Sequence, residues 1–176
     1  FHYVPCADDD RIITGAATAA LELYEELGNS TDPLDYLLAP VGAGGLLSGT
    51  SLSSKYLSPR TKVIGVEPEL AKDAYLSFTT GVLHKQLPPV TIADGLRIGL
   101  GVRTFEIIKK FVDDIITVEE EEIIEAMKNF WINTKMIIEP SSATVLAAIV
   151  KDQRFRNKRV GVILSGGNLD IKKLPF

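Results

Sequence analysis

The sequence has few of the residues from which disulfide frameworks and cysteine-based metal sites are built. Its 176 residues include one cysteine, Cys6, and two histidines. One cysteine cannot form an intramolecular disulfide or a zinc site of several cysteines, and such scarcity is typical of proteins in a reducing compartment. We therefore expect a cytoplasmic protein.

Long apolar runs and an excess of positive charge are also missing. No stretch of 18 consecutive apolar residues occurs, so we expect no segment to span a membrane. The chain has 19 Lys and Arg against 23 Asp and Glu, which gives a net charge of −4. A nucleic-acid-binding surface needs clustered basic residues. We therefore expect neither a nucleic-acid partner nor a membrane partner.

The residues that are present have an ordinary globular composition, 45% hydrophobic and 24% charged. Short continuous apolar runs predict strands at 34–40, 62–66, 115–118 and 160–164. Apolar residues at helical spacing predict helices at 12–27, 46–57, 70–80 and 103–111, from the end of the third strand through 134, and at 140–150. Apolar strands that alternate with helices favour a mostly parallel sheet with helices on both faces. The predicted fold class is α/β, with one domain over residues 1–176.

Capping residues predict where two of the helices begin. Thr117, with Glu120 three residues later, has the spacing of a capping box. Pro140 occupies a first-turn position, where the missing N–H of proline costs nothing. The sequence thus predicts helix starts just after Thr117 and at Pro140.

Two glycine-rich segments directly follow two of the predicted strands. Val41–Leu46 reads Val-Gly-Ala-Gly-Gly-Leu, and Leu164–Asn168 reads Leu-Ser-Gly-Gly-Asn. In parallel sheets ligands bind at the carboxyl ends of the strands, and a helix N-terminus there offers free N–H groups to a phosphate. Either segment alone could be only a tight strand-to-helix turn. Their occurrence at two strand ends favours a ligand.

A dinucleotide is one candidate for that ligand. Gly42-x-Gly44 follows a strand and opens a helix, and Glu67 ends the next strand 25 residues later, as in a Rossmann fingerprint. The third small position of that fingerprint is occupied by Leu47, where close helix–strand packing favours a small residue. A nucleotide-binding regulatory or oxidoreductase domain is therefore the alternative function.

Five short motifs occur in a fixed order along the chain. They are Val41–Leu46, Gly65–Pro68, Thr91–Gly95, Ile138–Pro140 and Leu164–Asn168. This set resembles the serine racemase and threonine dehydratase family, pyridoxal-phosphate enzymes of the tryptophan-synthase-β fold type, also called fold type II. The resemblance implies the large cofactor-binding domain of a homodimeric dehydratase (ammonia-lyase) or racemase that acts on L-serine or L-threonine.

The resemblance also implies which residues bind pyridoxal 5'-phosphate. The glycine loop would hold the phosphate, a serine hydroxyl would bond the pyridine nitrogen, and one glycine would lie near the ring. These cofactor-binding residues would be Gly42, Ala43, Gly44, Gly45, Leu46, Gly95 and Ser165. Ala43 replaces the family's usual glycine, which matters only if the position needs a positive φ.

The serine racemase branch of the family further implies a site for a divalent cation. Its ligands would be Glu67, the backbone carbonyl of Ala71, and Asp73. Such an all-oxygen set suits Mg²⁺, Mn²⁺ or Ca²⁺. Without the resemblance, Glu67 and Asp73 can also be read as two ordinary acids at a strand-to-helix turn. Asp73 would then only stabilise the first turn of the helix through the helix dipole.

The resemblance places the Schiff-base lysine of the family in a Ser-x-Lys-x-Arg-Gly segment. The 176 residues do not contain that segment. We therefore expect this chain to be the C-terminal part of the large domain, without the small domain and the lysine segment. On this expectation the chain carries no catalytic residue of its own and is inactive alone.

Overall fold

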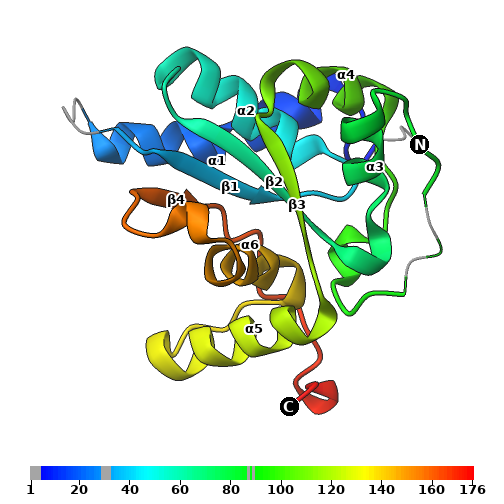
Figure 1. Ribbon diagram of the computed structural model, residues 1–176, viewed down its shortest axis with the longest axis vertical. Coiled ribbons are helices and arrows are strands. Elements are labelled where there is room, and N and C mark those ends of the chain that lie inside the picture. The colour runs from blue at the N-terminus through cyan, green and yellow to red at the C-terminus, as the bar shows by residue number, and fades with distance from the viewer. Residues whose placement is uncertain (1–4, 29–32, 87, 89) are drawn as a thin grey trace.

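The computed structural model describes residues 5–28, 33–86, 88 and 90–176, in which helices and short strands alternate (Figure 1). The helices are α1 (Asp10–Leu27), α2 (Gly45–Leu57), α3 (Asp73–Thr80), α4 (Val102–Phe111), α5 (Glu120–Thr134) and α6 (Pro140–Lys151). The strands are β1 (Tyr36–Pro40), β2 (Lys62–Pro68), β3 (Asp114–Val118) and β4 (Val160–Val162). Short 3-10 turns occur at Glu69–Ala71, Asp94–Leu96, Gln153–Phe155 and Ile171–Lys173.

The strands form one sheet in the order β3-β2-β1-β4, and every neighbouring pair is parallel. All four strands therefore end at the same edge of the sheet. Figure 1 shows α1, α2 and α4 on one side of the sheet and α5 and α6 on the other. The predicted α/β class, parallel sheet and two covered faces are confirmed. None of the described helices is both long enough and apolar enough to cross a membrane.

Each face of the sheet carries its own hydrophobic core, because successive strand residues point to opposite faces. Leu37, Val63 and Ile115 pack with apolar residues of α1, α2 and α4. Leu38 and Ile64 pack with apolar residues of α5 and α6. This two-sided burial explains why the strands read as continuous apolar runs rather than as alternating ones.

The start of α6 is confirmed at Pro140, but the predicted start of α5 is wrong. Thr117 belongs to β3, which continues through Val118, so it cannot cap the helix. The backbone N–H of Glu119 instead donates to the Glu122 carboxylate at 2.8 Å. This capping pair lies two residues C-terminal to the predicted pair, Thr117 and Glu120. The Glu120 carboxylate is used elsewhere and accepts the N–H of Ile92 at 2.7 Å.

Other boundaries also differ from the predicted ones: β1 begins at Tyr36 rather than at residue 34, and β2 continues to Pro68 rather than ending at residue 66. The helix expected at 70–80 is divided into a 3-10 turn, Glu69–Ala71, and α3, which begins at Asp73. Lys72 separates them with φ −85° and ψ 34°, outside the α region. The last strand ends at Val162 rather than at residue 164, since β1 pairs with it only through Leu38.

The contact between α1 and α2 allows a direct test of this packing. A Cβ added at Gly49 of α2 would lie 2.5 Å from the Ala17 nitrogen and 2.7 Å from the Ile13 carbonyl oxygen, both backbone atoms of α1. We expect Gly49→Ala to lower the free energy of unfolding by about 1–3 kcal/mol, because the two helices must move apart.

Gly15 of α1 is the matched control, because a Cβ there has nothing within 4 Å. Gly15→Ala should leave stability unchanged or raise it by up to about 1 kcal/mol, as alanine favours helix. Urea unfolding of both variants measures the difference. Equal stability of Gly49→Ala and the parent chain would contradict the close contact.

Candidate functional site

A cavity of about 380 Å³ lies where the two glycine-rich segments meet, at the carboxyl end of β1. It is lined by Cys6, Ala7, Ile12, Ala16, Pro40, Gly42, Ala43, Gly44, Gly45, Leu46, Gly95, Leu96, Ile98, Glu139, Ser141 and Ser165. Every residue proposed above as cofactor-binding is in this set. The structure therefore brings them together around one cavity, while their role toward a cofactor stays a prediction.

The loop before α2 has the shape of an anion cradle. Gly44 has φ +88° and is the N-cap of α2, a left-handed conformation that favours glycine. A Cβ at Gly44 would also lie 2.6 Å from the Leu100 side chain and 2.8 Å from Cβ of Thr104. The N–H groups of the first turn of α2 have no partner within the helix, and its dipole favours negative charge there.

Alanine in the loop is compatible with this conformation. Among the described residues, the non-glycine residues with positive φ are Lys135 and Asn157, so Ala43 does not have a positive φ. The substitution of the family's usual glycine by Ala43 therefore introduces no backbone strain.

The sequence analysis missed the residues that brace this loop from α4. The hydroxyl of Thr104, a fully buried side chain, donates to the Ala43 carbonyl at 2.7 Å. The same hydroxyl accepts the N–H of Gly101 at 3.0 Å. Asp8 in turn accepts the N–H groups of Arg103 and Thr104 at 2.8 and 3.1 Å, and so caps α4. The bonds of Thr104 to Ala43 and of Asp8 to α4 join residues 61 to 96 apart in sequence, so no local pattern could have indicated them.

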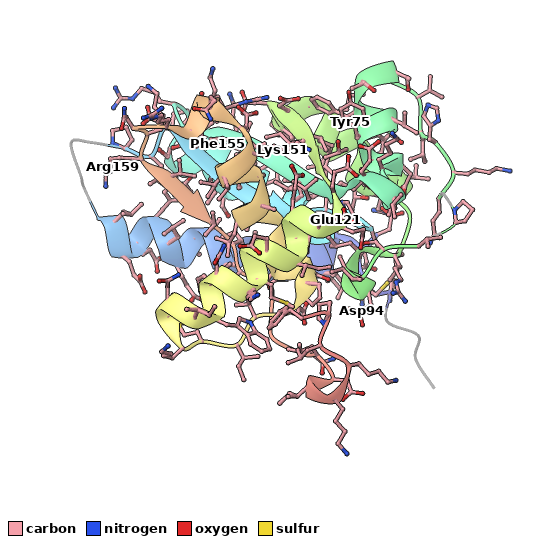
Figure 2. All side chains as sticks on the ribbon, turned by 60° about the horizontal axis from the view of Figure 1, so that its bottom comes forward. Tyr75, Asp94, Glu121, Lys151, Phe155 and Arg159 are labelled. Atoms are coloured by element: carbon pink, nitrogen blue, oxygen red, sulfur yellow. The ribbon has the colours of Figure 1, made fainter. Side chains whose placement is uncertain are left out.

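The opposite wall of the cavity is held by the start of α6. The N–H of Glu139 donates to the Gly166 carbonyl at 3.1 Å. The Glu139 carboxylate accepts the N–H of Asn168 at 2.8 Å. The Gly95 N–H donates to Ser141 Oγ at 3.2 Å, which ties the short turn after Ala93 to the same helix start. Asp94, labelled in Figure 2, begins that turn.

Among the described residues that line the cavity, Glu139 is the one with a formal charge. The cavity is otherwise walled by small and apolar side chains, by backbone N–H groups and by the hydroxyls of Ser141 and Ser165. This arrangement can fix an anionic group at the glycine loop and a flat polar ring between the loop and Ser165.

Glu67 and Asp73 are both buried, at 1% and 2% exposure. The two carboxylate oxygens of Glu67 accept the N–H groups of Ala74 and Tyr75 at 3.0 and 2.8 Å, which caps α3. Burial raises the pKa of Glu67 to about 9, and the negative charge of Asp73 adds to this shift. Tyr75 is labelled in Figure 2.

Asp73 links this pair to the segment beside the glycine loop. Its carboxylate accepts the N–H of Leu100 at 3.0 Å, and burial raises its pKa. Ala71 lies in the 3-10 turn between the two acids. The described residues contain no group of three or more His, Cys, Asp or Glu side chains that could hold a metal ion. The predicted cation site, which has two side chains and a carbonyl, stays a prediction.

A larger hollow of about 580 Å³ lies between α5 and α6. Glu121 and Lys151, labelled in Figure 2, belong to its rim, and Phe130, Leu146 and Val150 are among its apolar lining residues. It lies on helix sides rather than at the strand ends, and no glycine loop borders it. In parallel sheets ligands bind at the carboxyl ends of the strands, so the smaller cavity is the candidate site.

The chain resembles known proteins along most of its length. Residues 1–166 match the family described as pyridoxal-phosphate dependent enzyme. The chain is 49% identical over 173 residues to a serine racemase of Dictyostelium discoideum, covering 95% of this chain and 52% of that protein. It is 45% identical over 170 residues to a beta-hydroxyaspartate dehydratase of Paracoccus denitrificans (strain Pd 1222), covering 96% and 53%.

The fold of this chain is also similar to that of a solved structure. The crystal structure of a T.th. threonine deaminase superposes with a TM-score of 0.87 at 44% identity, over 93% of this chain and 59% of that one. This chain spans about half the length of the curated relatives that it matches.

The bracing of the glycine loop by Thr104 can be tested with the whole protein. Thr104→Val removes the hydroxyl bonded to Ala43 and keeps the size of the side chain. Loss of one buried hydrogen bond should weaken pyridoxal-phosphate affinity about fivefold. Thr104→Ser should retain most of the affinity, because it keeps the hydroxyl.

Thr61 provides the control for this substitution. It is also buried, and its hydroxyl donates to the Leu34 carbonyl at 2.8 Å, near the opposite ends of the strands. Thr61→Val should lower stability to a similar degree without changing cofactor affinity, as measured by fluorescence titration. Unchanged affinity in Thr104→Val would mean that the loop keeps its shape without α4.

Proposed function

Since the chain belongs to the family of pyridoxal-phosphate dependent enzymes, we propose that the whole protein is a serine or threonine ammonia-lyase, a serine racemase, or both. The observation that carries this proposal is the single cavity bounded by the glycine loop, Gly95 and Ser165 at the carboxyl end of the sheet. The family match argues against the alternative of a nucleotide-binding regulatory or oxidoreductase domain, and nothing in the comparisons supports that alternative.

The cavity fits the cofactor that the family implies. The backbone of Gly42–Leu46 and the N-terminus of α2 would hold the phosphate, since they combine free N–H groups with a favourable dipole. Ser165 would bond the pyridine nitrogen, and Gly95 would lie beside the ring. When bound, pyridoxal phosphate supplies an electron sink for the α-carbon of an amino acid. Ser165 is a neutral hydroxyl, so it can bond that nitrogen without holding a proton on it as a carboxylate would.

The charge of the cavity supports a small neutral side chain on the substrate. The Paracoccus relative is named for β-hydroxyaspartate, which carries a second carboxylate. In this cavity the described charged lining residue is Glu139, which is negative and would repel such a group. L-serine and L-threonine also carry the β-hydroxyl but have a hydrogen or a methyl group in place of that carboxylate, so they avoid this repulsion.

The remaining groups of the active site would come from outside these residues. The chain spans about half of its relatives and contains no Ser-x-Lys-x-Arg-Gly segment. We propose that residues 1–176 form the C-terminal part of the large domain and that the Schiff-base lysine and the small domain belong to the rest of the whole protein. We also propose a cytoplasmic homodimer, as the resemblance and the low cysteine content imply.

A divalent cation, Mg²⁺, Mn²⁺ or Ca²⁺, would bind between Glu67, the Ala71 carbonyl and Asp73. Each carboxylate oxygen of Glu67 accepts one N–H and keeps a further acceptor site, so capping α3 does not exclude a cation. Two buried carboxylates close to each other are costly when both are ionised. A bound cation would compensate that charge through oxygen ligands, which these ions prefer.

Turnover by the whole protein tests the proposed function. Loaded with pyridoxal phosphate, it should convert L-serine or L-threonine into a 2-keto acid and ammonia, or L-serine into D-serine. Keto acid is followed by a coupled dehydrogenase assay and D-serine by chiral chromatography. Absence of both activities would contradict the proposal. Full activity of the 176-residue chain alone would contradict the placement of the lysine outside it.

Chelation tests the cation site separately. EDTA should lower the melting temperature of the whole protein, and added Mg²⁺ should restore it, because a ligand that binds only the folded state stabilises it. Glu67→Gln should abolish both shifts. Glu106→Gln, a substitution at an exposed residue of α4, should preserve them. A melting temperature of the parent protein that is insensitive to EDTA would leave Glu67 and Asp73 as helix-capping and loop-holding residues only.

A further inference from the structure

Ser142 is a fully buried serine in the first turn of α6, directly behind the Ser165 wall of the cavity. Its Oγ lies 3.1 Å from Ser165 Oγ, and either hydroxyl can be the donor of that hydrogen bond. Ser165 lines the cavity, whereas Ser142 does not. Ser142 can therefore act on a bound molecule only through Ser165.

The hydrogen-bonding capacity of Ser142 limits the arrangements that are possible. A serine hydroxyl has one proton to donate and two acceptor sites. One acceptor site takes the N–H of Gly166 at 2.8 Å. The single proton can go either to the Gly166 carbonyl, also at 2.8 Å, or to Ser165 Oγ.

The two choices place the Ser165 proton differently. If Ser142 donates to the Gly166 carbonyl, its second acceptor site is open to the Ser165 proton, which then points away from the cavity. If Ser142 donates to Ser165 Oγ, the Ser165 proton is free to point into the cavity. The Gly166 carbonyl is not left without a partner in the second case, because the N–H of Glu139 donates to it at 3.1 Å.

We propose that Ser142 is a positioning residue for Ser165, and that it donates its proton to Ser165 Oγ so that Ser165 donates to the pyridine nitrogen of the cofactor. This inference rests on the proposed function, because it requires a ring nitrogen as the acceptor. The Gly166 N–H holds Ser142 in place in both arrangements, so only the two hydroxyl protons need to rotate.

The arrangement strengthens the bond that Ser165 makes. A hydroxyl that accepts a hydrogen bond is polarised and becomes a better donor. Both groups are neutral, so the pair adds donor strength at the ring nitrogen without adding a charge to the cavity. The Ser165 side chain is exposed at the cavity, and the contact with the buried Ser142 restricts its rotation.

The experiment uses the whole protein loaded with pyridoxal phosphate labelled with ¹⁵N in the ring. The ¹⁵N chemical shift of the ring nitrogen reports its hydrogen bond directly and does not depend on turnover. Ser165→Ala should move the shift to the value without this hydrogen bond. Ser142→Ala should move it part of the way in the same direction, and Ser142→Thr, which keeps the hydroxyl, should restore it.

Ser51→Ala is the matched control. Ser51 is also fully buried in a helix, and its hydroxyl donates to the Ser48 carbonyl at 2.8 Å, away from the cavity. It should leave the ¹⁵N shift unchanged. In the protein without cofactor, Ser142→Ala should also speed amide exchange of Gly166 by roughly two- to tenfold, because that N–H loses its acceptor.

The outcomes separate this inference from the proposed function. A ¹⁵N shift that changes in Ser165→Ala but not in Ser142→Ala would overturn the role of Ser142 and leave the cofactor assignment intact. A shift that is insensitive to Ser165→Ala would remove Ser165 from the ring nitrogen, and the role of Ser142 with it. Failure of the whole protein to bind pyridoxal phosphate would overturn the proposed function itself.

Discussion

The candidate site depends on one close approach, that of the start of α4 to the glycine loop. The space beside Gly44 is too small for a side chain, and Thr104 of α4 bonds the carbonyl of Ala43 directly. This contact sets the direction of the free N–H groups at the start of α2. An anion site made of backbone groups has no side chains that could adjust to a ligand, so its affinity depends on how firmly the backbone is held.

Side chains from other elements also satisfy the starts of two further helices and one N–H group before a short turn. Asp8 caps α4 from the segment before α1, and Glu67 at the end of β2 caps α3. Glu120 of α5 holds the N–H of Ile92 just before the turn that carries Gly95. Unpaired N–H groups at helix starts are costly when buried. The bonds of Asp8 and Glu120 satisfy backbone N–H groups and also join elements that are distant in sequence.

Burial also raises the pKa of two acids near the candidate site, Glu67 and Asp73. Glu67 and Asp73 lie near each other under the segment that carries Leu100, and their pKa values are raised because burial disfavours charge. Leu100 packs against Gly44, so the state of these acids is connected through a short chain of contacts to the glycine loop.

The amino-acid sequence was sufficient to establish the α/β class, the parallel sheet, the start of α6 at Pro140 and the glycine residues that border the cavity. These features follow from local signals: continuous apolar runs, a first-turn proline and glycines just after strands. The start of α5 and the roles of Asp8, Thr104 and Ser142 became visible only in the folded chain. Pairing in β3 removed Thr117 from the cap that its spacing predicted, whereas the partners of Asp8, Thr104 and Ser142 in other elements lie 23 to 96 residues away. Local patterns carry no information on contacts at such separations, because these depend on how helices pack across the finished sheet.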